Sequence, residues 1–413
     1  MRVSIHTLGT RGDVQPYLAL AVALRARGHE ALLIAPAQFE AMAAAHSVPF
    51  AALPAEFLDI LQSPEAKALI GRSAPGFGAG WKLLKHYRGL MQTLMTTEAT
   101  AARDFASQGV VFHPKSLAGP HIAEQLGIGS VLALPLPGLT PTSAFPSPLL
   151  PFASLGPFNR ASHGLMIHGA GVLFGGTIRR WRENALGLSG KGRPPAPRGT
   201  LYAYSPAVLP KPRDWDDTVD VTGYWTLATP EWSPPADLAA FLSKGEAPVF
   251  VGFGSMPEAD PHSVTSAVIE GLRCAGKRGL LATAGGAITR MEAGEDIMFI
   301  DGAPHDRLLP LMHSAIHHGG AGTTGAVLRA GIPGAICPFL GDQPFWARRV
   351  HELGVGPMPL RKHQLSGDTV AAAVTAMEDP QMRSRAVAIG EIIRGEDGLG
   401  RAVARLEQWL PQG

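Results

Sequence analysis

Short apolar runs alternate with stretches of helical spacing along the first half of the chain. Residues 2–8 are strand-like, glycine and charge interrupt the pattern at residues 9–13, and residues 14–27 carry apolar side chains at helical spacing up to Gly28. Further apolar strands are expected at residues 30–35, 109–112 and 129–134. Strands and helices that alternate in this way predict an α/β fold, with a parallel sheet covered by helices on both faces.

The same alternation restarts near Pro248, after a stretch rich in proline, glycine and charge. We place a linker within that stretch, at residues 211–236. The chain has 413 residues, more than one hydrophobic core usually supports. We therefore expect two doubly wound, Rossmann-like domains, at residues 1–210 and 237–395, and a final helix in residues 396–413 that packs back toward the first domain. The strands expected in the second domain lie at residues 248–252, 279–284, 297–300, 315–318 and 334–338.

Charge and cysteine content narrow the classes of function. Lys and Arg total 36 against 34 acidic residues, a net charge of +2, which gives no electrostatic reason to expect a nucleic-acid partner. Cys274 and Cys337 lack the Cys-x-x-Cys spacing of metal and redox motifs, and a reducing cytoplasm is the simplest setting. The first residues lack the apolar core of a signal peptide, and the most apolar stretch, residues 164–178, is too short to span a bilayer.

A glycine-rich turn joins the strand expected at residues 315–318 to a helix expected at residues 326–330. Unpaired backbone N–H groups and the positive end of the helix dipole suit a phosphate at such a turn, and His318 can add a hydrogen bond. The same glycines also suit a tight turn that binds nothing. The turn alone leaves both interpretations open.

Asp342 and Gln343 favour the phosphate interpretation, because they follow the strand expected at residues 334–338. Ligands of open α/β sheets bind at the carboxyl ends of the strands, so both side chains are expected beside His318. A carboxylate next to a carboxamide suits neighbouring sugar hydroxyls, which need an acceptor and a donor. Together these features predict a nucleotide-sugar site.

Two segments carry a resemblance to a known family. HHGGAGTTGAVLRAGIP (residues 317–333) and PFLGDQPFWARRV (residues 338–350) closely resemble the signature of the sterol and antibiotic glycosyltransferases, which are inverting enzymes of the two-domain GT-B fold. The resemblance extends to residues 9–21, 221–256 and 303–310, and so to both domains. It implies a UDP-sugar as co-substrate, with no cofactor and no metal.

The resemblance also implies roles for individual residues. Asp13 would be the catalytic base, Ala303 and His305 would lie by the nucleobase, and Asp342 and Gln343 would hold the sugar. The remaining donor contacts that it implies are Thr10, Gly12, Ser255, His318, Gly320, Ala321, Gly322 and Thr323.

Asp13 has a second interpretation. A carboxylate at a strand-to-helix loop is well placed to accept the proton of an acceptor hydroxyl, but Asp before Val14 is also a good helix N-cap. The residues alone favour the cap, whereas the resemblance favours the base. His6 is another candidate base, although a single histidine within a strand more often packs in the core.

The chain departs from the family pattern at several positions. Gly302 and Ala326 stand where plant relatives carry an aromatic residue against the base and an acidic residue for the ribose, which leaves uridine and thymidine diphosphate donors both open. Arg307 stands where the family pattern usually has the tryptophan of His-Asp-Trp. Its positive charge is expected either near the donor or in solvent. Residues 214–216 have the Asp-x-Asp form of a metal site, but they lie in the linker, and we interpret them as a solvated turn.

The acceptor is expected to bind the first domain. Residues 139–178 form a long apolar stretch whose only formally charged residue is Arg160, and we interpret it as a binding loop in which Phe145, Phe152 and Phe158 contact a hydrophobic acceptor. The alternative is that the segment belongs to the core and to an interdomain packing surface. Peripheral membrane contact through this surface is a further expectation, without support from a basic amphipathic helix; the oligomeric state is not predicted.

The sequence thus predicts an inverting, metal-independent glycosyltransferase. It would move a hexose, glucose by preference, from UDP-glucose to a hydroxyl of a sterol, terpenoid, flavonoid or polyketide. The alternatives are a nucleotide-sugar epimerase of the same fold and a non-catalytic partner protein that retains the fold.

Overall fold

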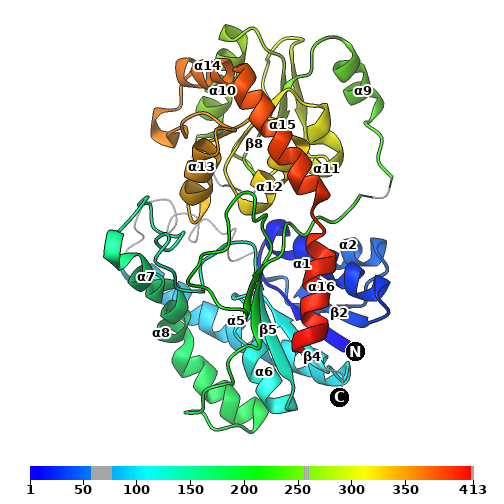
Figure 1. The fold of residues 1–413 in the computed structure, drawn as a ribbon, viewed down its shortest axis with the longest axis vertical. Coiled ribbons are helices and arrows are strands. Elements are labelled where there is room, and N and C mark those ends of the chain that lie inside the picture. Colours follow the sequence, from blue (N-terminus) through cyan, green and yellow to red (C-terminus); the bar gives the residue numbers. More distant parts are fainter. Residues whose placement is uncertain (57–76, 230, 255, 257, 259, 411–413) are drawn as a thin grey trace.

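A computed structural model describes residues 1–56, 77–229, 231–254, 256, 258 and 260–410. Two parallel sheets, each flanked by helices, form the two domains, one above the other in Figure 1. The GT-B architecture expected from the sequence is confirmed.

The first sheet has seven parallel strands in the order β3-β2-β1-β4-β5-β6-β7. Most of its central positions are buried, as expected for a parallel sheet covered on both faces. Its last strand, β7, lies beyond residue 210, so the sheet continues into the stretch predicted as a linker. The strands are β1 (Arg2–His6), β2 (Glu30–Pro36), β3 (Phe50–Leu53), β4 (Gly109–Phe112), β5 (Gly129–Leu134), β6 (Gly199–Tyr202) and β7 (Val219–Val221).

The helices of the first domain differ from the sequence-based expectation at two places. The first helix begins at Arg11 rather than Val14, because Thr10 is its N-cap and Asp13 is its third residue. The segment predicted as a binding loop ends in a regular helix, α8, which packs on α5. The helices are α1 (Arg11–Ala26), α2 (Glu40–Ala45), α5 (Phe77–Asp104), α6 (Gly119–Leu126), α7 (Asn159–Ser162) and α8 (Gly164–Trp181).

The second sheet has five parallel strands in the order β10-β9-β8-β11-β12. Its strands are β8 (Val249–Gly252), β9 (Gly279–Ala282), β10 (Ile297–Ile300), β11 (Ser314–His317) and β12 (Gly334–Ile336). The helices of this domain are α9 (Ala236–Ser243), α10 (Pro261–Cys274), α11 (His305–Leu308), α12 (Ala321–Ala330), α13 (Gln343–Glu352), α14 (Gly367–Ala376) and α15 (Pro380–Gly395).

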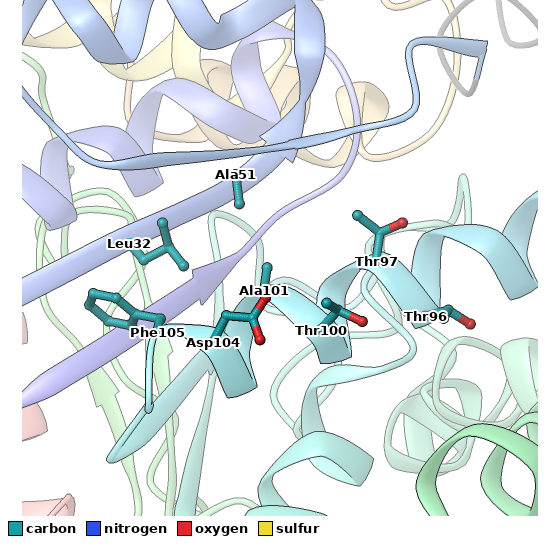
Figure 2. A pocket seen from close by; sticks show the side chains of 8 residues that line it. All are labelled: Leu32, Ala51, Thr96, Thr97, Thr100, Ala101, Asp104 and Phe105. Carbon is teal, nitrogen blue, oxygen red and sulfur yellow. The ribbon is translucent and has the colours of Figure 1, made fainter.

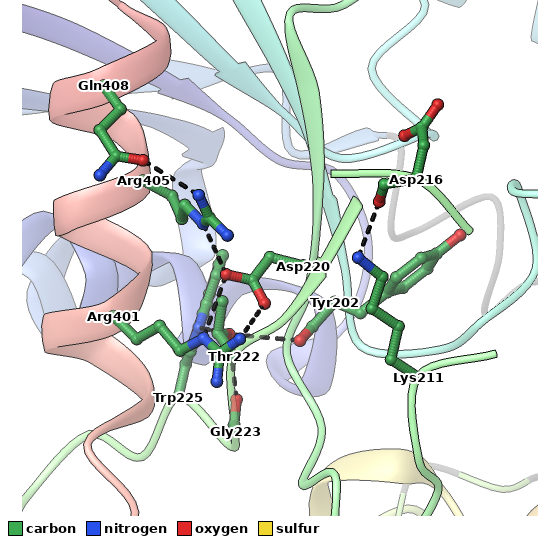
Figure 3. Close-up of polar contacts among 10 residues, drawn as sticks. All are labelled: Tyr202, Lys211, Asp216, Asp220, Thr222, Gly223, Trp225, Arg401, Arg405 and Gln408. Atoms are coloured by element: carbon green, nitrogen blue, oxygen red, sulfur yellow. Dashed lines mark hydrogen bonds and ion pairs between the residues drawn. The ribbon is translucent and has the colours of Figure 1, made fainter. Parts of the chain in front are cut away.

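The last helix, α16 (Gly398–Trp409), returns to the first domain and packs on α1 (Figure 1). Its apolar face joins the first core, and its polar face meets Asp220 at the centre of β7. Asp220 accepts hydrogen bonds from Arg401 at 2.5 and 3.0 Å and from Arg405 at 2.7 Å, as Figure 3 shows. The chain end is thereby fastened to the first sheet.

An aromatic cluster joins the two domains. Phe145 and Trp215 of the first domain pack with Phe345 and Trp346 of the second, and the ring centroids of Phe145 and Phe345 lie 5.5 Å apart. Trp215 is buried and stacks on Tyr202 at 4.8 Å. The prediction of a solvated turn at residues 214–216 is therefore wrong, because its central residue belongs to the interdomain core.

No helix in the described part of the chain is both long enough and apolar enough to span a bilayer.

Candidate functional site

The turn after β1 brings the Asp13 carboxylate against the backbone. Gly9 has a φ of +132°, and a Cβ at this position would lie 2.1 Å from Oδ2 of Asp13. Only glycine therefore fits the turn. The backbone N–H of Thr10 donates to Oδ2 of Asp13 at 2.9 Å, and the Thr7 hydroxyl donates to the Asp13 carbonyl at 2.6 Å. The sequence-based alternative of Asp13 as N-cap is thus wrong in detail, since its carboxylate caps from the third position of the helix.

The loop after β4 supplies the other partners of Asp13. Nζ of Lys115 donates to Oδ1 at 2.8 Å, and Nε2 of His113 lies 3.6 Å from the same oxygen. Burial by itself raises the pKa of Asp13, but the charge of Lys115, the neighbouring His113 and the hydrogen bonds from Lys115 and Thr10 outweigh it, and the pKa lies below its usual value. Asp13 is therefore ionised at neutral pH.

His113 is neutral at the same pH. Burial and the nearby charge of Lys115 lower its pKa to about 3, although Asp13 opposes this shift. Sequence reasoning missed both His113 and Lys115. The available signal was their position directly after the strand expected at residues 109–112, at the same sheet edge as Asp13.

His6 takes no part in this arrangement. It is fully buried, with Nδ1 2.9 Å from Glu98 and Nε2 3.0 Å from the Ser4 hydroxyl. The structure therefore places it in the core rather than beside Asp13.

The turn between β11 and α12 forms the second half of the site. Gly254 and Gly320 make room for the His318 ring, because a Cβ at Gly320 would lie 2.5 Å from its Nε2 and a Cβ at Gly254 would lie 2.9 Å from its Cε1. Helix α12 has no side-chain cap. The first backbone N–H of the helix to make a hydrogen bond is that of Thr324, which donates to the Gly320 carbonyl at 2.9 Å. The N–H groups of Ala321, Gly322 and Thr323 remain available to a ligand.

Buried polar atoms without hydrogen-bond partners gather at this turn. Among the described residues they include Nδ1 of His318 and the hydroxyl of Thr324. Burial and the neighbouring His305 lower the pKa of His318 to about 4, although a backbone contact with Gly252 opposes this shift, so the ring is neutral at pH 7. Unsatisfied buried polar groups are unusual and indicate a missing partner, here one that presents hydrogen-bonding atoms to the end of α12.

Charged groups of the first half-site influence pKa values in the second. The charge of Arg11, at the start of α1, reaches His305 and, after burial, is the second cause that lowers its pKa to about 4. Burial raises the pKa of Asp342 and the Trp346 hydrogen bond opposes this shift, while Asp13 and Lys115 of the first domain have smaller influences of opposite sign. Ala303 is half-buried close to His305, and Gly12 is exposed in the first turn of α1. Ser255 lies outside the described residues.

Asp342 and Gln343 begin α13 but differ in what they offer a ligand. Asp342 is half-buried, and its Oδ2 accepts a hydrogen bond from the Trp346 indole at 2.8 Å. Gln343 is buried, with Oε1 accepting from the N–H groups of Phe339 at 2.6 Å and Leu340 at 3.0 Å. Its Nε2 lies 3.1 Å from the Met256 sulfur. The Gln343 amide therefore holds the preceding loop, and its predicted contact with the sugar stays a prediction.

Arg307 is exposed, in agreement with the expectation of a solvated charge, and it also contacts the linker. Its Nε donates to the carbonyl of Thr229 at 3.1 Å, and the neighbouring Asp306 accepts from the N–H and hydroxyl of the same threonine at 3.1 and 2.9 Å. These two side chains fasten the linker to the second domain.

The three predicted acceptor residues lie in different surroundings. Phe145 is 9% exposed within the interdomain cluster, which matches the packing alternative. Phe152 and Phe158 are 51% and 70% exposed. Arg348 of α13 donates to the carbonyls of Pro151 at 3.1 Å and Phe152 at 2.9 Å, so the segment touches the second domain beside Asp342.

A separate pocket lies between β2, β3 and α5 (Figure 2). Its lining includes Leu32, Thr100 and Phe105 and none of the predicted site residues. Within the described ranges, no group of three or more His, Cys, Asp or Glu side chains could hold a metal ion.

Comparison with known proteins identifies the family. Residues 3–145 match the glycosyltransferase family 28 N-terminal domain, and residues 289–395 match the erythromycin biosynthesis protein CIII-like C-terminal domain. The chain is 31% identical over 426 residues to a sterol 3-beta-glucosyltransferase of Arabidopsis thaliana, covering 100% of this chain and 68% of the plant protein.

The chain therefore belongs to the glycosyltransferase family that includes this plant sterol 3-beta-glucosyltransferase. It is also 33% identical over 436 residues to a sterol 3-beta-glucosyltransferase of Cryptococcus neoformans, but it spans only 27% of the length of that relative. The prediction from the sequence that this chain is an enzyme of the glycosyltransferase family is thereby confirmed.

Solved structures support the fold. The glycosyltransferase of kitacinnamycin aligns with a TM-score of 0.72 at 18% identity, covering 99% of both chains. The glycosyltransferase VinC, solved in complex with dTDP, aligns with a TM-score of 0.69 at 16% identity over 100% of both chains. At this identity the likeness establishes the shared architecture.

Proposed function

We propose that this family member transfers glucose from UDP-glucose to a hydroxyl of a sterol-type acceptor, with inversion at the anomeric carbon. The observation that carries the proposal is the presence of an ionised carboxylate, Asp13, in the first domain together with an uncapped helix N-terminus, α12, in the second. Its relatives in Arabidopsis thaliana and Cryptococcus neoformans are named as sterol 3-beta-glucosyltransferases, which supports both the sugar and the acceptor class.

The donor diphosphate would bind at the start of α12. The N–H groups of Gly322 and Thr323, the helix dipole and the neutral His318 ring suit its negative charge. Asp342 would accept hydrogen bonds from the sugar, while Gln343 would support it by fixing the loop. Ser255 remains a predicted contact on sequence grounds, and Ala303 and His305 remain the predicted neighbours of the nucleobase.

The reaction would be a single displacement. Asp13 takes the proton of the acceptor hydroxyl, and the oxygen electron pair forms the new bond to the anomeric carbon from the face opposite the diphosphate. The electron pair of the broken bond leaves with the diphosphate, whose added charge is stabilised by the N–H groups of α12.

Apolar side chains near residue 150 would contact the acceptor. Phe152 and Phe158 expose apolar surface on a segment that is fastened to α13 by Arg348. Burial of such surface contributes about 25 cal/mol per Å², which suits a flat apolar molecule such as a sterol.

The test is diphosphate release and glycoside formation from UDP-glucose and TDP-glucose, each with and without cholesterol, a flavonoid and a macrolide. We expect release that depends on cholesterol and UDP-glucose, with cholesteryl glucoside as the product. A product that contains only a free altered sugar nucleotide would favour the epimerase. Tight UDP binding without turnover on any pair would favour the non-catalytic partner protein.

A further inference from the structure

Lys115 is the strongest partner of the proposed base, and the family comparison gives it no role. It follows β4, the strand hydrogen-bonded to β1, so its loop ends at the same sheet edge as the turn that carries Asp13. The Lys115 side chain is 49% exposed, whereas the Asp13 side chain is 18% exposed. The ammonium thus covers Oδ1 of Asp13 from the solvent side at 2.8 Å.

His113 fixes the geometry of this contact. The backbone N–H of Lys115 donates to Nδ1 of His113 at 3.1 Å, so the proton of the neutral ring lies on Nε2. Nε2 lies 3.6 Å from Oδ1 of Asp13. His113 in this state has no free nitrogen to accept a proton, and it is therefore a support for Asp13 rather than a second base.

The two carboxylate oxygens of Asp13 consequently have different surroundings. Oδ2 is bound by the Thr10 N–H inside the helix cap, at a place where even a Cβ at Gly9 would collide with it. Oδ1 is bound by the half-exposed Lys115 ammonium. Oδ1 is therefore the oxygen that a substrate hydroxyl can reach, on condition that the ammonium shares it or moves aside.

We infer that Lys115 is a positioning residue for glycosyl transfer, one that holds Oδ1 of Asp13 toward the second domain and neutralises its charge until the acceptor proton arrives. The inference rests on the proposed function of Asp13 as base. The exposed, flexible ammonium can retain contact with a carboxylate that is gaining a proton, or turn toward the negative charge that leaves on the diphosphate.

The charges around Asp13 determine the pH dependence. Lys115 and His113 face it from the loop after β4, the Tyr17 hydroxyl from its own helix, and Asp342 from the second domain. Of these, Lys115 lowers the pKa of Asp13 most, and His113 lowers it less. Its removal raises the pKa of Asp13, so the base becomes protonated, and inactive, at a higher pH than in the wild type.

The experiment compares Lys115→Met and Lys115→Arg with the wild type, using UDP-glucose and cholesterol and recording kcat and kcat/KM across pH. Lys115→Met should lower kcat roughly ten- to a hundredfold through loss of orientation, and it should move the acidic limb of kcat/KM to higher pH. Lys115→Arg should restore the position of the acidic limb. Lys277→Met, which removes another lysine paired with carboxylates, is the matched control and should leave the limb in place.

An unchanged acidic limb in Lys115→Met, with an active wild type, would overturn the inference but not the proposed function. A wild type that transfers no glucose to any acceptor would overturn both. A second readout does not depend on turnover: the urea midpoints of wild type, Lys115→Met, Asp13→Asn and the double variant at pH 7. The shifts in midpoint caused by the two single substitutions should not add up to the shift of the double variant, whereas additive shifts would contradict coupling between the two side chains.

The pH dependence of this coupling has a definite sign. Because the pKa of Asp13 is lowered in the folded protein, the stabilisation it gives is present above its unfolded pKa and is lost as the pH falls through the folded pKa. The difference between wild type and Lys115→Met should therefore shrink between pH 7 and strongly acidic pH. A difference that stays constant over this range would contradict an ionic role for Lys115.

Discussion

The two halves of the candidate site differ in how their polar groups are satisfied. In the first domain, both carboxylate oxygens of Asp13 have donors, from Thr10 and Lys115. In the second domain, the uncapped end of α12 lies beside Nδ1 of His318 and the Thr324 hydroxyl, which are buried and have no partner among the described residues. One half is complete without a ligand, and the other is incomplete.

This difference separates a group that must keep its charge and orientation from groups that must receive a ligand. A base needs its carboxylate held in place before the reaction, and its partners provide that. A diphosphate site needs donors that are not already used, and leaving them unused lowers the stability of the empty protein. The following changes test each side of this comparison.

The largest effect is expected from Asp13→Asn. The amide keeps the shape and can still accept the Thr10 N–H, but it cannot take a proton, so kcat should fall about 10²- to 10⁴-fold. The Kd for UDP, measured by calorimetry, should stay close to the wild-type value because the donor half is untouched. Asp104→Asn, at the end of α5, is the control; a comparable loss of kcat in that variant would remove the case for a specific base.

Phe145 and Phe158 separate packing from acceptor binding. Phe145→Ala should lower the free energy of unfolding by about 3 kcal/mol, because it leaves a cavity in the buried cluster between the domains. Phe158→Ala, at a 70% exposed position, should leave that energy nearly unchanged and raise the KM for cholesterol. Urea unfolding and steady-state kinetics measure the two quantities. An unchanged KM in Phe158→Ala would remove that residue from the acceptor surface.

Gln343→Leu tests whether this side chain supports a loop or holds a sugar. The substitution leaves the N–H groups of Phe339 and Leu340 without their acceptor, and the free energy of unfolding should fall by about 2 kcal/mol. Urea unfolding is the measurement. If stability is unchanged while the KM for UDP-glucose rises, Gln343 contacts the sugar as the family resemblance implied.

Gly320→Ala should have the smallest effect. The new Cβ would lie 2.5 Å from Nε2 of His318 and displace the ring, so the Kd for UDP should rise about tenfold, or about 1.4 kcal/mol. Gly89→Ala on α5, where nothing lies within 4 Å, is the control. Equal UDP affinity in the two variants would show that His318 does not contribute to donor binding.

The donor turn could be predicted from the sequence because its determinants are local. The glycines around His318 fix a strand, a turn and a helix start within a few residues. β11 lies within one residue of the expected strand, whereas α12 begins at Ala321, inside the glycine-rich stretch and five residues before the expected helix. The partners of Asp13 could not be found in this way, since Lys115 is 102 positions away and meets it only through the pairing of β1 with β4.

Side-chain orientation was the other thing that local pattern did not predict. Asp342 and Gln343 are adjacent and were expected to act together. The amide of Gln343, the first residue of α13, instead accepts a hydrogen bond from the loop at Phe339. Phe145 was grouped with Phe158 by composition, but only the arrangement of both domains shows which of them is covered. Contacts within the second domain decide the first case, and contacts across the domains decide the second.

The anomeric configuration of the product tests the central claim most directly. UDP-glucose carries an α-linked sugar, and a single displacement assisted by Asp13 must deliver a β-glucoside. The coupling constant of the anomeric proton in purified cholesteryl glucoside, measured by NMR, distinguishes the two configurations. A β-glucoside is the result that this account predicts, and an α-glucoside would contradict direct attack from the Asp13 side.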